Sequence, residues 1–218
     1  MIGVQNVEAD VETSVRYAKS AATRGADAII SLPPRGKSDV QIIDHYNAVG
    51  AATSLPLIAQ AVGSISMELL VTLFREVPTL KALKDEAGNP LLRAKQLISE
   101  TGGKLADFSG GGGRTMLTEM HLGFSGCCPY VGLADLYQRS FNLWHGGRER
   151  EAFDMLGRIS AFNEIPGSNE YILVVRGTFP DTAVMRRAAG HPRTLLDSDQ
   201  KEFIRDAWIR FLRPYLRA

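Results

Sequence analysis

A lysine at the end of a short apolar segment is the residue whose type and position best suit it for chemistry. Lys84 follows Leu80, Ala82 and Leu83, and the chain then continues through a charged pair to Gly88. The apolar residues predict a buried strand, and α/β barrels place their chemistry at the carboxyl ends of such strands. A lysine amine that has lost its proton attacks a ketone and forms a Schiff base, a reaction for which arginine is unsuited.

The ordinary alternative is that Lys84 is a solvated residue just past a strand, paired with Asp85 or Glu86. A free lysine amine is almost fully protonated at pH 7, because its pKa is about 10.4. A Schiff-base site therefore has to desolvate the amine, since desolvation lowers the pKa of a lysine. This segment alone favours the ordinary alternative, and the rest of the chain decides between the two.

Length and charge argue for one domain without a polyanionic partner. The chain has 218 residues, which is enough to bury a large core. Its 25 basic residues are balanced by 24 acidic ones and are scattered, so we expect neither a nucleic-acid partner nor binding to an anionic membrane. No apolar run approaches the roughly 20 residues of a membrane span, and the N-terminus lacks the pattern of a signal peptide.

The cysteines and histidines form no pattern typical of a metal site. Cys127 and Cys128 are the only cysteines, and such neighbours make a poor disulfide and half a metal site at best. This usage is typical of a protein in the reducing cytoplasm. The four histidines have no spacing that suggests a metal triad. We therefore expect a cytoplasmic protein that binds no metal.

Strands and helices alternate along the first 130 residues. Strands are predicted at 26–32, 55–62, around Lys84, at 104–109 and at 123–128, with helices at 11–24, at 39–52, after the cap Ser66 and from Pro90. This alternation predicts parallel βαβ units, and hence a Rossmann-like open sheet or a barrel. Beyond Pro129 the pattern predicts only helices, at 133–144, 148–162 and 198–216.

A run of four glycines, Gly110–Gly113, follows one strand and precedes a helix. Backbone amides at such a place are able to bind an anion, but a tight turn between strand and helix is the ordinary explanation. No Gly-x-Gly-x-x-Gly turn stands near the start of the chain, so the main signal of a dinucleotide-binding open sheet is missing.

The order and spacing of these segments resemble the dihydrodipicolinate synthase / N-acetylneuraminate lyase family. The matching stretches are Gly25-Ala26-Asp27-Ala28, Leu55-Pro56-Leu57-Ile58, Leu83-Lys84-Asp85, Phe108-Ser109-Gly110 and Gly123-x-x-Gly126. The resemblance implies an α/β fold of the (β/α)8 TIM-barrel type with a C-terminal helical extension. It also implies a homo-oligomer, either a dimer or a tetramer, that acts on 2-oxo acids through a lysine Schiff base and needs no cofactor.

The match to this family begins at about its third barrel strand. We therefore expect an N-terminally truncated barrel of about six strands. Residues 1–130 are predicted to form this partial barrel, and residues 131–218 the last barrel helix and the C-terminal helical region of the same continuous domain.

The resemblance assigns the chemistry to two residues. Leu83-Lys84-Asp85 matches the motif that bears the Schiff-base lysine, so Lys84 is the expected covalent residue. Lys81 lies three positions earlier, and side chains alternate along a strand, so we assign it to the helix-facing or solvent side. Gln60 stands where the family has a tyrosine that relays protons. Glutamine does not titrate in the useful range, so proton transfer would need water, the substrate or another residue.

Four further residues are candidates for binding the substrate. Arg35 replaces an aromatic residue of the family's proline-led loop, where it would hold a second carboxylate or the hydroxyls of a sugar acid, unless it is an ordinary loop arginine. Gly110 and Gly111 begin the glycine turn. At Cys128 the resemblance implies a backbone carbonyl near the substrate, while the ordinary role of the thiol is packing.

The resulting hypothesis is a Schiff-base-forming lyase, either an aldolase or a dehydratase, that acts on a pyruvate-type 2-oxo acid. The missing tyrosine argues against dihydrodipicolinate synthesis and favours a 2-keto-3-deoxy sugar acid as substrate. One alternative is a 4-hydroxy-tetrahydrodipicolinate synthase-like enzyme. The other is a truncated, non-catalytic barrel remnant that serves as a binding or assembly subunit, because the family's carboxylate-binding turn has no counterpart in the chain.

Overall fold

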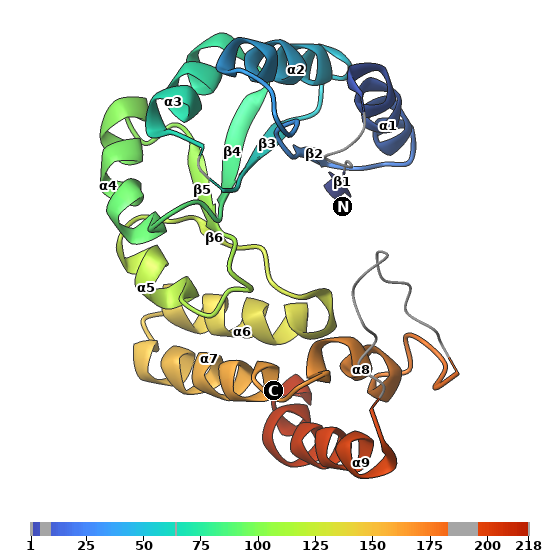
Figure 1. Ribbon diagram of the computed structural model, residues 1–218. Coiled ribbons are helices and arrows are strands. Elements are labelled where there is room, and N and C mark those ends of the chain that lie inside the picture. The colour runs from blue at the N-terminus through green and yellow to red at the C-terminus, as the bar shows by residue number, and fades with distance from the viewer. Residues whose placement is uncertain (1, 5–9, 64, 183–195, 218) are drawn as a thin grey trace. The chain divides into compact units, whose positions relative to one another are not determined.

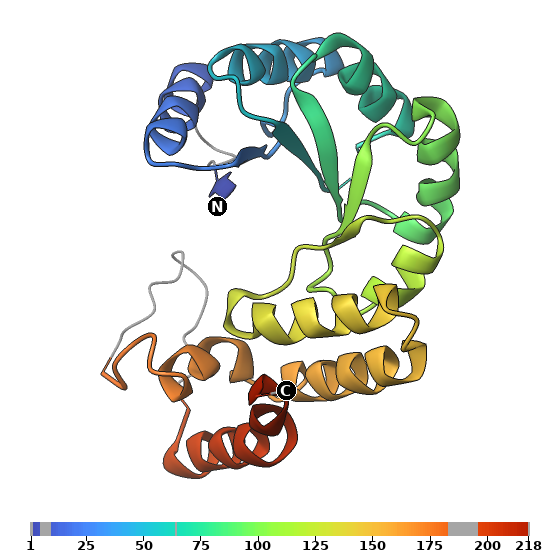
Figure 2. The same ribbon diagram turned by 180° about the vertical axis from the view of Figure 1, so that it is seen from behind.

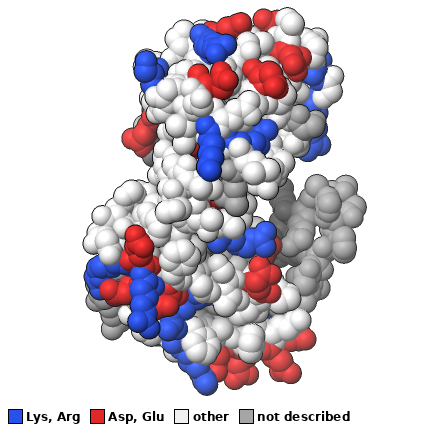
Figure 3. Space-filling model, turned by 90° about the vertical axis from the view of Figure 1, so that its left-hand side faces the viewer, with Lys and Arg blue, Asp and Glu red and all other residues white. Residues whose placement is uncertain are grey.

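The chain forms two compact units, Met1–Cys128 and Pro129–Ala218. The computed structural model describes residues 2–4, 10–63, 65–182 and 196–217. No helix among these residues is both long enough and apolar enough to cross a membrane. Figure 3 shows one face of the molecule, on which both signs of charge are interspersed.

The first unit, called the sheet unit below, contains one parallel sheet. In the described residues its six strands are β1 (Ile2–Val4), β2 (Ala28–Ser31), β3 (Leu57–Ala61), β4 (Leu80–Asp85), β5 (Ala106–Ser109) and β6 (Gly126–Cys127). They lie in the sheet in the order of the sequence, and every neighbouring pair is parallel. A doubly wound open sheet would reverse its strand order at some point, so this order is that of a barrel.

The helices of the sheet unit all lie on one side of its strands (Figure 1; seen from behind in Figure 2). They are α1 (Val11–Thr23), α2 (Asp39–Ala51), α3 (Met67–Glu76), α4 (Pro90–Thr101) and α5 (Met116–His121). These elements confirm the predicted alternation, with differences of a few residues at their ends.

Side-chain caps explain where several of these helices begin. Ser66 accepts a hydrogen bond from the backbone N–H of Leu69, as the sequence predicted for the start of α3. At the start of α2, Ser38 and Gln41 form a capping box, in which each side chain bonds to the backbone of the other residue. These bonds satisfy amides that have no partner within the helix.

The sheet buries a different core on each face. The helix-facing core contains Ile29, Leu57 and Leu83 from the strands together with Leu70 and Leu73 from α3. The opposite face, called the inner face below, carries a smaller cluster in which Ile30, Ile58 and Ala82 are buried, with Ala28, Ala106 and Phe108 packed against them. Because side chains alternate along a strand, every second residue of β3 and β4 belongs to the inner face.

A β-bulge in β4 changes which of its residues face each core. Leu57 pairs with Leu80, but the next residue, Ile58, pairs with Ala82, so Lys81 is the additional residue of the bulge. Leu80 consequently belongs to the helix-facing core, whereas Ala82 belongs to the inner face. Lys81 itself is exposed, which agrees with its assignment to the solvent side.

The second unit, called the helical unit below, is helical throughout its described residues. A short 3₁₀ helix (Val131–Leu133) is followed by α6 (Ala134–His145), α7 (Glu149–Asn163), α8 (Ser168–Val175) and α9 (Ser198–Ala207). Helices α6 and α7 lie side by side (Figures 1 and 2). The unit buries its own apolar residues, among them Leu136, Tyr137, Ile159, Ile204 and Trp208.

Two features of the helical unit differ from the sequence prediction. The helix predicted over 198–216 is wrong in its second half, because the α-helix ends at Ala207 and continues as a π-helical turn (Trp208–Leu212) and a 3₁₀ helix (Arg213–Arg217). Helix α8 was not predicted. It begins after Gly167, whose φ of 80° suits a glycine and separates α8 from the preceding turn.

Candidate active site

The predicted Schiff-base lysine lies on the inner face of the sheet, near the carboxyl end of β4. Gln60, Lys84 and Phe108 are direct partners in the register of β3, β4 and β5, so they form one row across the sheet. This row lies two residues beyond the row of Ile58 and Ala82. The Lys84 side chain is only 19% exposed, so most of its stem is shielded from water.

One carboxylate joins the two residues that the sequence singled out for chemistry. The Nζ atom of Lys84 lies 2.8 Å from Oε1 of Glu86. The Nε2 atom of Gln60 donates a hydrogen bond of 2.7 Å to Oε2 of the same carboxylate. Glu86 thus holds Lys84 with one oxygen and Gln60 with the other.

The backbone around Glu86 is fixed by the sheet. Its N–H donates to the carbonyl oxygen of Ala61 at 2.8 Å, which continues the pairing of β3 and β4 past the end of β4. Gly110 donates its N–H to the carbonyl oxygen of Asp85 at 3.0 Å. A side chain at position 110 would collide with Cγ of Glu86. A glycine is therefore needed at Gly110 so that Glu86 can reach the row.

Glu86 is the functional candidate that sequence reasoning missed. In the sequence it stands only as a possible ion-pair partner of a solvated Lys84. The available signal was its position two residues after Lys84, since side chains two apart on a strand share a face. Its second partner, Gln60, lies 26 residues away in the sequence, and that contact follows only from the pairing of β3 with β4.

Cys128 lies beside the same group of charges. Its N–H donates to the carbonyl oxygen of Ser109 at 2.8 Å. Burial raises the pKa of the Cys128 thiol, an effect that the Lys84 ammonium opposes and the Glu86 carboxylate reinforces. A raised pKa keeps the thiol protonated and makes it a poor nucleophile. Cys127 is also inert, since burial is the main cause that raises its pKa to about 12.

Arg35 and Gly111 lie further from this centre. Arg35 is exposed in the turn after β2, and β3 separates β2 from the strand that carries Lys84. Gly111 is exposed in the turn after β5. Both follow carboxyl ends of parallel strands, which is the edge of the sheet that Lys84 also approaches. Their roles in binding a substrate remain predictions.

The acid of the lysine motif points to the other side of the sheet. Asp85 belongs to the helix-facing side, where its Oδ2 atom lies 3.1 Å from Nε of Arg93 and its Oδ1 atom accepts a hydrogen bond from the N–H of Ala87. Arg93 also donates to the carbonyl oxygen of Ile65 at 3.1 Å. Asp85 therefore ties the end of β4 to the following loop and to α4.

Two more buried acids, which were not predicted from the sequence, lie near Asp85. Asp107 and Glu119 are 5% and 3% exposed. The pKa of Asp107 is raised to about 8, first by burial and then by the charges of Asp85 and Glu119, against the effect of Arg93. No described residue donates a hydrogen bond to either carboxylate oxygen of Asp107. This acid is consequently protonated at neutral pH.

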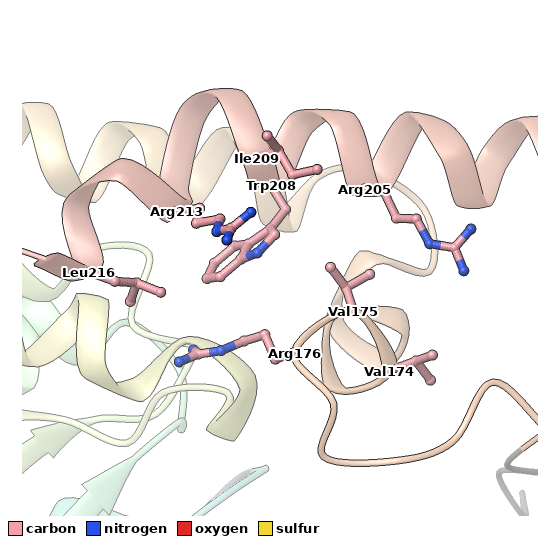
Figure 4. Close-up of a pocket in the computed structure, with 8 residues that line it drawn as sticks. All are labelled: Val174, Val175, Arg176, Arg205, Trp208, Ile209, Arg213 and Leu216. Carbon is pink, nitrogen blue, oxygen red and sulfur yellow. The ribbon is translucent and has the colours of Figure 1, made fainter.

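The helical unit has an open cavity of about 570 Å³, lined by Val174, Val175, Arg176, Arg205, Trp208, Ile209, Arg213 and Leu216 (Figure 4). Arg176 forms two short hydrogen bonds with the Asp135 carboxylate, at 2.8 and 2.6 Å, and its guanidinium lies 5.1 Å from the centre of the Trp208 ring. Arg205 pairs with Asp181 at 3.5 Å. These partners neutralise both arginines, and we interpret their roles as structural.

No group of three or more His, Cys, Asp or Glu residues in the described parts of the chain is arranged to hold a metal ion. The groups present at the row of Lys84 are an amine, a carboxylate and an amide. Such a set is able to form a covalent bond to a carbonyl carbon and to move protons around it.

Comparison with known proteins places these features in a family. The model of the dihydrodipicolinate synthetase family matches residues 4–204. A 4-hydroxy-tetrahydrodipicolinate synthase of Corynebacterium diphtheriae is 36% identical over 115 residues, which cover 50% of this chain and 36% of that protein. The corresponding enzyme of Rhizobium meliloti is 31% identical over 93 residues, covering 39% and 31%. The matched part thus spans about a third of the length of these relatives.

Solved structures show the same fold. The 4-hydroxy-tetrahydrodipicolinate synthase of Methylacidiphilum fumariolicum SolV aligns with a TM-score of 0.78 at 18% identity, over 99% of this chain and 73% of that one. A catalytic lysine mutant of the Ruminococcus gnavus sialic acid aldolase aligns with a TM-score of 0.77 at 19% identity, over 96% and 74%. The predicted fold class, a barrel-type α/β sheet of about six strands with a helical extension, is confirmed.

Proposed function

Because the chain belongs to the dihydrodipicolinate synthetase family, we propose that it is a Schiff-base-forming lyase that acts on a pyruvate-type 2-oxo acid. The observation that carries the proposal is the placement of Lys84. It lies on the inner face of a parallel sheet near the carboxyl end of β4, and its amine contacts a carboxylate on one side. The conserved geometry of parallel α/β folds places chemistry at this edge.

Lys84 supplies the nucleophile. Its neutral amine forms a C–N bond to the ketone carbon of the substrate, and the carbonyl oxygen leaves as water. The resulting iminium ion withdraws electrons from the neighbouring carbon, so that a bond next to C3 breaks and its electron pair is held as an enamine. In an aldolase reaction the other fragment leaves as an aldehyde after its hydroxyl has lost a proton. Return of a proton to that carbon and addition of water to the iminium then release the product and free Lys84. No metal or cofactor takes part in these steps.

The finer identity of the substrate depends on Gln60. We propose a 2-keto-3-deoxy sugar acid, because Gln60 stands where the family resemblance expects a tyrosine and because it is already bonded to Glu86. The second candidate is 4-hydroxy-tetrahydrodipicolinate synthase-like activity, which is the activity named for the curated relatives. Turnover of a 2-keto-3-deoxy acid, compared with formation of 4-hydroxy-tetrahydrodipicolinate, separates the two.

Trapping of the covalent intermediate tests the central claim. The protein is incubated with pyruvate and borohydride, which reduces the iminium ion to a stable amine, and its peptides are mapped by mass spectrometry. We expect the added mass on Lys84 and none on Lys81. The absence of any adduct on a folded sample, with pyruvate and with a 2-keto-3-deoxy acid, would favour the third candidate, a non-catalytic barrel remnant that binds a partner.

We also propose that the protein is a cytoplasmic homo-oligomer. Both cysteines are free thiols, which is common in reducing compartments. Phe203, Ile209 and Phe211 of the helical unit are large apolar residues with about half or more of their surface exposed, and a neighbouring subunit would bury them. Light scattering that reports a monodisperse monomer would contradict the oligomer.

A further inference from the structure

Formation of a Schiff base at Lys84 requires an acid–base group. The ammonium must lose a proton before it attacks, and the hydroxyl of the first adduct must gain one before it leaves as water. Gln60, which pairs with Lys84 in the register of the sheet, carries an amide that does neither. In the described structure, the carboxylate of Glu86 lies in contact with the Lys84 amine.

Building on the proposed lyase function, we propose that Glu86 is the catalytic acid–base of this site. Its Oε1 atom lies 2.8 Å from the Lys84 nitrogen, within the range over which a proton passes directly. The side chain of Glu86 is 27% exposed, so the carboxylate is open to an entering substrate. Asp85 does not compete for this role, since it is held by Arg93 on the helix-facing side.

The proton steps balance with Glu86 alone. Its carboxylate first takes a proton from the Lys84 ammonium, and the neutral amine forms the C–N bond to the ketone carbon. The protonated carboxyl then gives this proton to the former carbonyl oxygen. It takes a second proton from the nitrogen and delivers it to the hydroxyl, which leaves as water. An iminium ion remains, and Glu86 ends as the carboxylate with which it began.

Gln60 and Gly110 act as positioning residues for Glu86. The amide of Gln60 donates to Oε2 at 2.7 Å and so turns Oε1 toward the lysine. Gly110 leaves room for Cγ of Glu86, because any Cβ at this position would overlap it. Gln60 thus orients the carboxylate that carries the proposed proton transfer, two residues after the lysine.

The competing explanation is a structural ion pair between Lys84 and Glu86. An acid–base role and a structural ion pair predict different rates of adduct formation in the Glu86 variants and a different dependence of that rate on pH. The rate is measured with pyruvate by quenching with borohydride at increasing times. Glu86→Gln is expected to slow adduct formation by about 10²–10⁴-fold and to remove the part of the pH profile that reports a carboxylate. The matched control is Glu100→Gln on α4, which breaks an exposed pair with Arg75 of α3. It is expected to behave as the unmodified protein.

A second variant makes the test independent of how well the glutamine variant folds. Glu86→Ala leaves space for a small acid, and added formate is expected to restore the rate in proportion to its concentration. A structural ion pair would show no such rescue. Gln60→Ala is expected to slow the reaction less and to keep the carboxylate limb of the pH profile, since Gln60 only orients the acid.

The outcomes separate this inference from the function on which it rests. If Glu86→Gln forms the adduct within about twofold of the unmodified rate and with the same pH profile, Glu86 is not the acid–base and the lyase proposal survives. If the unmodified, folded protein forms no adduct with any 2-oxo acid, the proposed function itself is wrong, and so is the proposed role of Glu86.

Discussion

The sheet unit and the helical unit differ in how far their acidic side chains are exposed to water. In the sheet unit the acids Asp85, Asp107 and Glu119 are at most 5% exposed, on or beside the strands. In the helical unit the carboxylates that pair with basic residues are about half exposed, as in Arg148 with Glu151 and Lys201 with Asp181. Water screens the second kind of pair and makes each worth little, whereas buried charges change one another's protonation.

Aromatic rings also lie next to basic side chains in the helical unit. The guanidinium groups of Arg139 and Arg158 lie 6.0 and 5.1 Å from the centre of the Tyr215 ring, and Arg205 lies 5.2 Å from that of Tyr171. Such contacts add about 0.5–1 kcal/mol each at exposed sites. The comparison shows that the strands and the elements beside them hold carboxylates away from water, whereas the helical unit leaves its paired carboxylates largely solvated. The predictions below test this contrast.

The largest effect is expected at Lys84. Lys84→Ala should abolish turnover and adduct formation, because the covalent step loses its nucleophile. Lys81→Ala is the matched control on the same strand and should retain most of the activity, since Lys81 is the exposed residue of the bulge. Turnover of a 2-oxo acid and borohydride trapping measure both variants. An inactive Lys81 variant beside an active Lys84 variant, both folded, would mean that the lysine is misassigned.

The next effect concerns the stability of the sheet unit as a function of pH. The pKa of Asp107 lies at about 8 in the folded protein, above its ordinary value of 3.8. Between these two pH values the folded state keeps the proton on Asp107, whereas the unfolded state loses it. The free energy of unfolding therefore falls as pH rises through this range. The slope is at most about 1.4 kcal/mol per pH unit, and it disappears above pH 8.

Asp107→Asn should remove this slope and make the protein more stable than the unmodified chain at pH 8. Denaturant unfolding at a series of pH values measures the effect. Asp44→Asn, at an exposed position of α2, serves as the control and should leave the slope as it is. An unchanged slope in the Asp107 variant would show that this acid is ionised in the folded protein at neutral pH.

A smaller effect is expected from the ion pair of the helical unit. Arg176→Ala removes two hydrogen bonds to Asp135, one to the carbonyl oxygen of Gly132 and the stacking on Trp208. Because the Asp135 side chain is 46% exposed, we expect a loss of only about 1 kcal/mol. Arg210→Ala breaks a more exposed pair with Asp206 and should cost less. Thermal unfolding measures both, and a loss of several kcal/mol on replacing Arg176 would contradict the contrast between the units.

Effects similar in size to that of Arg176→Ala are expected from two helix caps, one in each unit. Ser38 begins α2 and Asp197 begins α9, each with a capping box. Replacement of either by alanine should cost about 1 kcal/mol. Denaturant unfolding followed by circular dichroism shows whether each loss appears in one common transition or in a transition of its own. Equal shifts of a single transition would mean that the units unfold together despite their different use of charge.

Much of the fold follows from local sequence, whereas the decisive contacts of the site do not. Apolar segments bounded by Ser66, Pro90 and the glycine turns located strands β2–β5 and helices α1–α4 within a few residues, whereas β1 and α8 were not predicted. The motif around Lys84 identified the expected nucleophile. The pairing of Gln60 with Glu86 arises from the register of two strands, and the interaction of Asp107 with Glu119 joins β5 to α5. Neither follows from periodicity, because each joins residues that are distant in the chain.

The bulge at Lys81 has a consequence for how the gene tolerates change. In a strand of strict period two, Leu80 and Lys84 would face the same side, since they lie four positions apart. The extra residue breaks this parity, so Leu80 faces the helices and Lys84 faces the inner side. A gene that lost the codon for residue 81 would restore regular pairing of Leu57 with Leu80 and of Ile58 with Ala82, and the lysine would keep its direction. A deletion at position 81 is thus expected to leave the direction of the proposed nucleophile unchanged.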